Sequence, residues 1–151
     1  MNVLININEM DVVDYITEKE NAIKHGISKD YSFINSELYF EKMKLDHKHI
    51  FVDGNNYNLD VLIEMVKNLK PYKITHLKIE GKIFYKTIFQ SESKLILVDG
   101  PLTSGYGGQG PSEFAKLLSN LGFDDDILEK YIFAKLGDAC IETTFILAEN
   151  V

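Results

Sequence analysis

The chain has 151 residues, of which 45% are hydrophobic and 26% are charged, and its formal net charge is -7. These values are typical of one globular domain, and no run of about 18 apolar residues is present that would span a bilayer. A general nucleic-acid binder normally carries a basic field, so the acidic balance argues against that class. The first residues, MNVLININEMD, lack the features of a secretory signal. We therefore expect a cytoplasmic protein with no membrane partner.

The N-terminal third predicts a strand followed by a helix. Apolar residues alternate with polar ones over residues 3–7, which is typical of a strand. Asn8 is then the expected N-cap of a helix that ends near Gly26. The apolar stripe expected on this helix is Met10, Val13 and Ile16. Residues 28–48 are compatible with a strand pair or, from Ser36, with a short helix.

The middle of the chain predicts one helix and several strands. HIFVD reads as a strand, and Asn58 is the expected cap of a helix that runs through Leu69 and is stopped by Pro71. Three further runs, YKITHLKIE, KIFYKTIF and KLILVD, are rich in β-branched and aromatic residues and are separated by Gly81 and by QSES. These runs predict an antiparallel meander.

The C-terminal third predicts two helices and a last strand. Apolar residues spaced as on one helix face precede Gly122, and a second helix is expected from about Asp124 to Gly137. The inward residues expected on these helices are Phe114, Leu117, Leu118, Leu121, Leu128, Tyr131, Ile132 and Leu136. ACIETTFILA reads as a strand in which Cys140, the single cysteine, is a buried small residue. The predicted fold is α+β, one domain over residues 1–151 with helices packed on a largely antiparallel, mixed sheet.

Two segments share the order strand, Val-Asp-Gly, loop, helix. In these segments Asp53 and Asp99 end their strands. Asp-Gly is common turn chemistry, so the structural interpretation is a pair of tight turns. The functional interpretation is that these carboxylates hold a ribose hydroxyl or share a metal, which requires them to be close in space.

Lysines gather in the middle of the chain, and arginine is absent altogether. The seven lysines of this region are Lys67, Lys70, Lys73, Lys78, Lys82, Lys86 and Lys94. Without guanidinium groups, any anion would be bound by ammonium groups and backbone N–H groups. After Pro111 the balance turns acidic, with Asp124, Asp125, Asp126 and Glu129.

The most distinctive segment is TSGYGGQGPSEFAKLL, which begins at Thr103 and has four glycines in six residues before a helix. Such a loop can aim backbone N–H groups at an anion, with Pro111 at the first helical position. However, the loop lacks the Lys-Ser/Thr ending of a P-loop, and Glu113 in the first turn would repel a phosphate. Two interpretations therefore stay open: a tight connection plugged by Tyr106, or a binding loop in which Tyr106 stacks on a ring. A positive φ at Gly107 would make alanine destabilising there.

The stretch GYGGQGPSEFAKLL resembles the Gly-Tyr-Gly-Gly-x-Gly-Pro-x-x-Leu-Ala signature of a family of small bacterial, phage and plasmid proteins. The matching residues are Gly105, Tyr106, Gly107, Gly108, Gly110, Pro111 and Ala115. Phe114 stands where the signature has leucine, and the match is confined to residues 105–118. The resemblance implies a mobile-element setting and supplies no activity.

No pattern identifies a catalytic site, a metal site or a cofactor. His47 and His49 flank Lys48, but no second half of a zinc site accompanies them. The flanking motif of a serine nucleophile is absent as well.

Three functions remain as hypotheses. The first is non-catalytic binding of a small anionic or nucleotide-like ligand, which in a phage setting would sequester a host immune signal. The residues expected at that site are Ser104, Gly105, Tyr106, Gly107, Gly108, Gln109, Gly110, Asp99, Lys82 and Lys86. The second is an anti-defence or immunity protein that blocks a host protein through its acidic surface. The third is a small hydrolase or transferase that uses Asp99 and a histidine. Each is compatible with a homo-oligomer.

Overall fold

The computed structural model describes residues 2–26, 32–79, 84–134, 137 and 139–148. In this part of the chain, six strands form one sheet with the order β1-β6-β3-β4-β5-β2. The strands are β1 (Asn2–Met10), β2 (Ile50–Asp53), β3 (Lys73–Ile79), β4 (Phe84–Gln90), β5 (Leu95–Asp99) and β6 (Cys140–Ala148). The helices are α1 (Val12–His25), α2 (Ser32–Lys44), α3 (Leu59–Leu69), α4 (Gln109–Asn120) and α5 (Asp125–Leu128), which continues as a π-helical turn, η1 (Glu129–Phe133).

The sheet is mixed but mostly antiparallel. Neighbouring strands run antiparallel except for β2 and β5, which are parallel. The predicted meander of three consecutive strands is confirmed as β3-β4-β5, and the predicted α+β class is confirmed with it. No helix among the described residues combines the length and the hydrophobicity needed to cross a bilayer.

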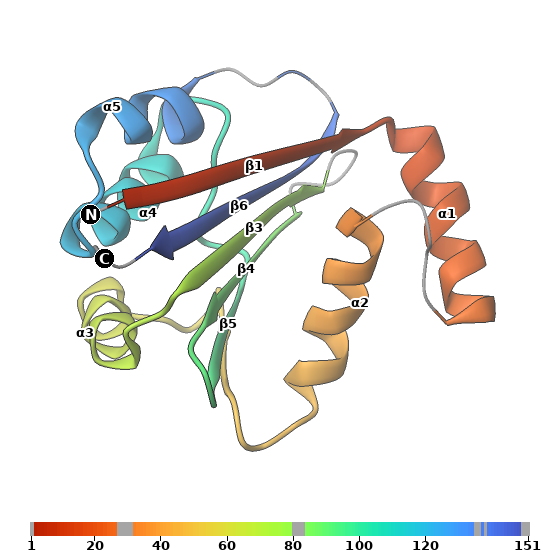
Figure 1. The fold of residues 1–151 in the computed structure, drawn as a ribbon, viewed down its shortest axis with the longest axis horizontal. Coiled ribbons are helices and arrows are strands. Elements are labelled where there is room, and N and C mark those ends of the chain that lie inside the picture. Colours follow the sequence, from red (N-terminus) through yellow and green to blue (C-terminus); the bar gives the residue numbers. More distant parts are fainter. Residues whose placement is uncertain (1, 27–31, 80–83, 135–136, 138, 149–151) are drawn as a thin grey trace.

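Helices cover both faces of the sheet (Figure 1). We call the face under α3, α4 and α5 the α4 face, and the face under α1 and α2 the α2 face. Successive side chains of a strand point to opposite faces of the sheet. Phe89 of β4 therefore packs in the core of the α4 face, and its neighbour Ile88 packs in a core of the α2 face. Buried aromatic residues anchor each layer: Phe114 of α4 on one side, and Phe33 and Phe40 of α2 on the other.

The start of the first helix differs from the prediction. The first strand is confirmed, but it extends to Met10, so Asn8 is a strand residue and does not cap a helix. Asp11 is the N-cap of α1, and its side chain accepts a hydrogen bond of 2.7 Å from the Val13 amide. The side chains that α1 buries are those of Tyr15 and Ala22, which lie on a different face from the expected stripe. Val13 and Ile16, which were expected in the core, are exposed.

The segment that the sequence left open forms a helix. α2 begins at Ser32, and residues 28–31 lie outside the described part of the chain. The predicted end of α1 is confirmed, since Gly26 adopts a φ of +99°. Asn58 is confirmed as the cap of α3, with its side chain accepting from the Val61 amide.

Two predictions for the C-terminal third were partly wrong. Pro111, expected at the first helical position, is the third residue of α4, where its missing N–H is still one of the unpaired groups of the first turn. The second helix is also shorter than expected, because its α-helical part ends at Leu128 and the π-helical turn ends at Phe133. Its inward residue Ile132 is buried as predicted, and Leu136 lies outside the described residues.

Candidate functional site

The glycine-rich loop is packed against itself. Gly105 has a φ of +88°, and its amide donates to the Ile132 carbonyl at 2.8 Å. A Cβ at Gly110 would lie 2.0 Å from the Thr103 hydroxyl oxygen, so only glycine fits there. At Gly107, by contrast, no atom lies within 4 Å of an added Cβ and φ is not positive. The condition for a destabilising alanine at Gly107, a positive φ, is therefore not met, and the positions of this loop that require glycine are Gly105 and Gly110.

Tyr106 folds back over its own loop. Its hydroxyl hydrogen-bonds to the Thr103 hydroxyl at 2.7 Å, and its ring lies close enough to contact an added Cβ at Gly108. Glu113, in the first turn of the helix that follows, accepts hydrogen bonds from the Tyr57 hydroxyl and from Gln109 Nε2, so its negative charge is held near the N-terminus, where it would repel an anion. This geometry favours the tight connection over the binding loop.

Ser104, another expected ligand contact, is buried in the α4 face. Its hydroxyl lies 3.0 Å from Nε2 of His76, and its carbonyl accepts from the Tyr85 hydroxyl at 3.0 Å. The other imidazole nitrogen of His76 lies 2.9 Å from the Thr87 hydroxyl. Burial lowers the pKa of His76 to about 3, so this imidazole is neutral. Ser104 and His76 form a structural network beneath the loop.

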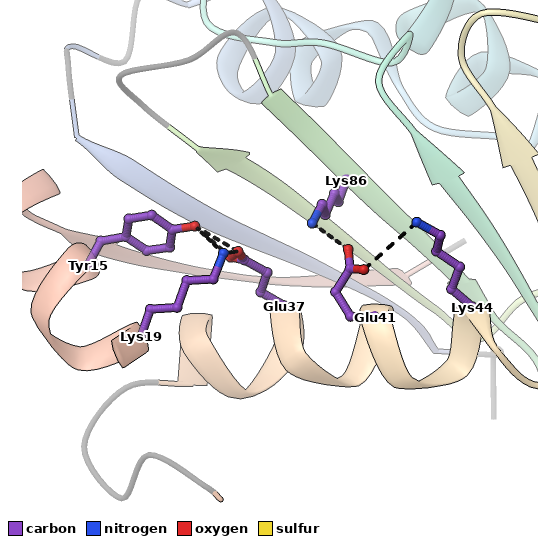
Figure 2. A network of polar contacts seen from close by, with 6 residues as sticks. All are labelled: Tyr15, Lys19, Glu37, Glu41, Lys44 and Lys86. Carbon is purple, nitrogen blue, oxygen red and sulfur yellow. Dashed lines mark hydrogen bonds and ion pairs between the residues drawn. The ribbon is translucent and has the colours of Figure 1, made fainter. Parts of the chain in front are cut away.

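The structure does not bring Lys86, one of the two expected lysines, together with the loop. Tyr85 of β4 faces the α4 face and contacts Ser104, so the next residue, Lys86, points to the α2 face (Figure 2). There the Lys86 ammonium lies 2.6 Å from the carboxylate of Glu41. Asp99 is the cross-strand neighbour of Lys86, and Lys82 lies outside the described residues.

Asp53 and Asp99 are close in space, which the sequence could not decide. They are register partners at the ends of the parallel strands β2 and β5. The Gly54 amide donates to the Asp99 carbonyl at 2.9 Å, and a Cβ at Gly54 would lie 2.5 Å from that carbonyl oxygen. Glycine is therefore needed at the first Asp-Gly turn because the two backbones approach closely there. This agrees with the interpretation of the Asp-Gly segments as tight turns.

Figure 2 shows how charged side chains fasten α2 to its neighbours. Glu37, which is buried, accepts hydrogen bonds from the Tyr15 hydroxyl at 2.7 Å and from the Lys19 ammonium at 2.5 Å. One turn later, the more exposed Glu41 pairs with Lys86 and lies 3.9 Å from Lys44. The three lysines Lys86, Lys44 and Lys19 lower the pKa of Glu41, against the opposing effect of its burial.

A second network lies beneath the start of α2. Glu142 of β6 is buried on the α2 face and accepts hydrogen bonds from Asn8, Ser32 and Ser36. The Asn8 and Ser32 contacts measure 2.9 and 2.8 Å. Asn8, the expected helix cap, instead links the edge strand to this carboxylate.

A cavity of about 800 Å³ opens between α2 and the sheet. Its floor consists of two adjacent cross-strand pairs of β3 and β4, and α2 supplies the wall. The floor residues are Lys73, Thr75, Ile88 and Gln90, and the wall includes Asn35, Ser36, Leu38, Tyr39 and Lys42. An apolar centre with hydroxyl, amide and ammonium groups around it is typical of a small-molecule site.

The two lysines of this cavity differ from the other lysines around α2. Lys19, Lys44 and Lys86 each form an ion pair with a carboxylate of α2. Lys42 and Lys73 pair with no carboxylate among the described residues, although both line the cavity. Lys73 belongs to the lysine-rich stretch of the sequence, where no pattern singles it out. Lys42 lies within residues 28–48, whose sequence is compatible with strands or with a helix and so gave no signal.

Neither His49 nor His76 lies beside Asp99, the carboxylate that the hydrolase hypothesis would use. His49 Nδ1 accepts from the Leu95 amide at the start of β5, whereas Asp99 ends that strand. His76 lies on the α4 face, opposite the face to which Asp99 belongs. In the part of the chain that the structure describes, no three His, Cys, Asp or Glu side chains converge to hold a metal ion.

Comparisons with known proteins give one weak relative. No family model matches the sequence, and no solved structure matches it. A release factor glutamine methyltransferase from Clostridium botulinum is 21% identical over 132 residues, which cover 84% of this chain and 47% of the relative. The chain thus spans about half the length of this curated relative. At this identity, the similarity does not establish a shared family.

Proposed function

We propose that the protein binds a small anionic, nucleotide-like ligand, without catalysis, in the cavity between α2 and the β3-β4 pair. The observation that carries this proposal is the presence of two ammonium groups, Lys42 and Lys73, that line the cavity and have no described carboxylate partner. A bound anion would supply the missing countercharge. Hydroxyl and amide groups around the cavity would provide the directional contacts that fix its orientation.

The cavity has a suitable size and lining for such a ligand. Small-molecule sites typically have volumes of about 300–1,000 Å³, and this cavity, which is open to solvent on one side, has a volume of about 800 Å³. The exposed ring of Tyr39 is available to stack on a base, and Ile88 offers an apolar floor. None of the described lining residues is a histidine, a cysteine or a carboxylate, which favours binding over acid–base catalysis. If the protein is encoded by a mobile element, this site would capture a signal nucleotide of the host.

Binding can be tested with charged and uncharged probes. Native mass spectrometry of the protein from its own host would reveal a co-purified anion, and calorimetry would compare AMP and ADP with uncharged adenosine. We expect the nucleotides to bind and adenosine to bind at least tenfold more weakly. The double variant Lys42→Met/Lys73→Met should lose about tenfold or more in affinity, since each ammonium group contributes a charge-assisted contact.

A matched control separates cavity chemistry from overall charge. Lys67→Met/Lys116→Met removes the same charge from exposed lysines of α3 and α4, on the opposite face. It should leave nucleotide affinity within about twofold at moderate salt. Equal losses in both double variants, or a wild-type protein that carries no anion and binds neither nucleotide, would contradict the proposal.

Partner blocking is the second candidate. It is favoured by the exposure of four acidic residues around α5: Asp124, Asp125, Asp126 and Glu129. Under this function, the protein would capture a basic host protein, and the double variant Asp125→Asn/Asp126→Asn would lose that binding. The variant Lys42→Met/Lys73→Met would still bind the host protein, and this result would support partner blocking over ligand binding.

A further inference from the structure

The two edges of the sheet are built differently. At one edge, β2 has four residues. At the other, β1 has nine residues that pair in unbroken register with β6, and no described strand pairs with its outer side. Proteins commonly shorten or interrupt an edge strand, because its row of unpaired N–H and C=O groups is a template for another strand. β2 follows this rule and β1 does not.

β1 also lacks the other features that protect an edge. Its sequence, NVLININEM, contains no proline and no lysine, and Glu9 is its sole charged residue. Leu4 is 62% exposed and Ile7 is 41% exposed, on opposite faces of the strand. A long, regular edge with exposed apolar residues is the kind that another strand covers.

We propose that a second copy of this chain covers this edge, with β1 pairing antiparallel to β1 about a two-fold axis at Asn6. This register pairs all nine residues of each strand and keeps each face of the sheet continuous. Ile5 then lies opposite Ile7 of the second copy on the α4 face, so the exposed Ile7 gains an apolar cross-strand neighbour. On the α2 face, Asn6 meets Asn6 of the second copy, where two amides can hydrogen-bond to each other.

Charge selects the same orientation. A parallel, in-register pairing would place the two Glu9 carboxylates side by side, which is destabilising. In the antiparallel register, Glu9 lies opposite Val3 of the second copy, and the two carboxylates are separated by about 20 Å along the strands. This register therefore forms an apolar Ile5–Ile7 pair on each side of the axis and keeps the two carboxylates apart, while Leu4 lies opposite Asn8 of the second copy.

The test uses substitutions at the two-fold axis. The Asn6 side chain is exposed, so Asn6→Lys and Asn6→Glu should leave the monomer folded. Sedimentation velocity over a concentration series should show a dimer for the wild type. Each variant should dissociate more readily by about fivefold or more, since like charges would face each other at the axis. An equimolar mixture of the two should associate again, because lysine then faces glutamate.

A positive charge placed away from the edge is the control for these variants. Asn21→Lys on α1 adds the same charge away from the edge and should dimerise like the wild type. Ile7→Lys is a second edge variant, which should also dissociate the dimer. A wild type that stays monomeric throughout the series would overturn the proposal. So would a dimer that Asn6→Lys, Asn6→Glu and Ile7→Lys leave intact while circular dichroism shows them folded.

Discussion

The glycine-rich loop and the cavity under α2 lie on opposite faces of one sheet, and they differ in whether their polar side chains have partners within the protein. In the loop, the hydroxyls of Thr103, Ser104 and Tyr106 all have hydrogen-bond partners within the protein. Under α2, Lys42 and Lys73 line a cavity without a described carboxylate partner. A loop rich in glycine can thus serve packing alone, whereas a ligand site is better recognised by polar groups whose partners are missing.

The largest expected effect tests whether the glycine-rich loop is a packed structure. Gly110→Ala would force a Cβ to within 2.0 Å of the Thr103 hydroxyl oxygen. We expect the free energy of unfolding to fall by about 3 kcal/mol, as measured by urea denaturation. Gly107→Ala is the matched control, because its added Cβ meets no atom, and it should change stability by less than about 0.5 kcal/mol. If Gly110→Ala changed stability as little as Gly107→Ala, Gly110 would not be sterically required.

The second test concerns the imidazole beneath the loop. The pKa of His76 is lowered by burial to about 3 in the folded protein, against about 6.5 in the unfolded chain. Between these values the unfolded chain binds a proton that the folded protein does not, so stability is present above pH 6.5 and is lost as the pH falls. We expect the free energy of unfolding to drop by about 2 kcal/mol between pH 7 and pH 5.

Substitution identifies the group responsible for that pH dependence. His76→Gln should flatten the loss between pH 7 and pH 5 even though it lowers stability at pH 7, because glutamine does not titrate. His47→Gln, at an exposed position, should keep the wild-type slope. A slope that survives in His76→Gln would mean that another group titrates and that His76 is not held neutral by burial.

The smallest expected effect is the difference in stability between variants of the two ion pairs that join α2 to its neighbours, Lys19–Glu37 and Lys86–Glu41. Glu37 is 2% exposed and holds both Lys19 and Tyr15, so Glu37→Gln should cost about 1.5 kcal/mol of stability. Glu41 is 45% exposed, so Glu41→Gln should cost less than about 1 kcal/mol. Thermal and urea unfolding would measure both. If Glu41→Gln were the more damaging, the exposed end of α2 would be its main anchor.

Much of the fold could be predicted because its signals are local. The strand runs of β3, β4 and β5 and the cap of α3 at Asn58 were recognised from neighbouring residues. The start of α1 was missed because Asn8 and Asp11 are both good caps, and the choice depends on β1 pairing with β6 as far as Met10. That pairing joins residues more than a hundred positions apart, which no local pattern reveals.

The candidate site was less predictable than the fold. The glycine loop is conspicuous in the sequence, but its compactness depends on contacts such as Gly105 with Ile132 and Ser104 with His76. The cavity depends on α2, whose sequence has a weak pattern and could be read as a strand or a helix. Lys42 therefore carried no signal that could have singled it out.

The sequence by itself determined the α+β class, the strands of the meander, both ends of α3 and the end of α1, because propensity and hydrophobic periodicity act over a few residues. The tertiary structure alone decided which lysines are neutralised. Lys73 and Lys86 lie on paired strands and face the same side of the sheet, and the chain around them is similarly rich in β-formers. Lys86 meets Glu41, which is 45 positions away, and Lys73 meets a cavity. The difference follows from how α2 crosses the sheet, since electrostatic partners are set by distance in space.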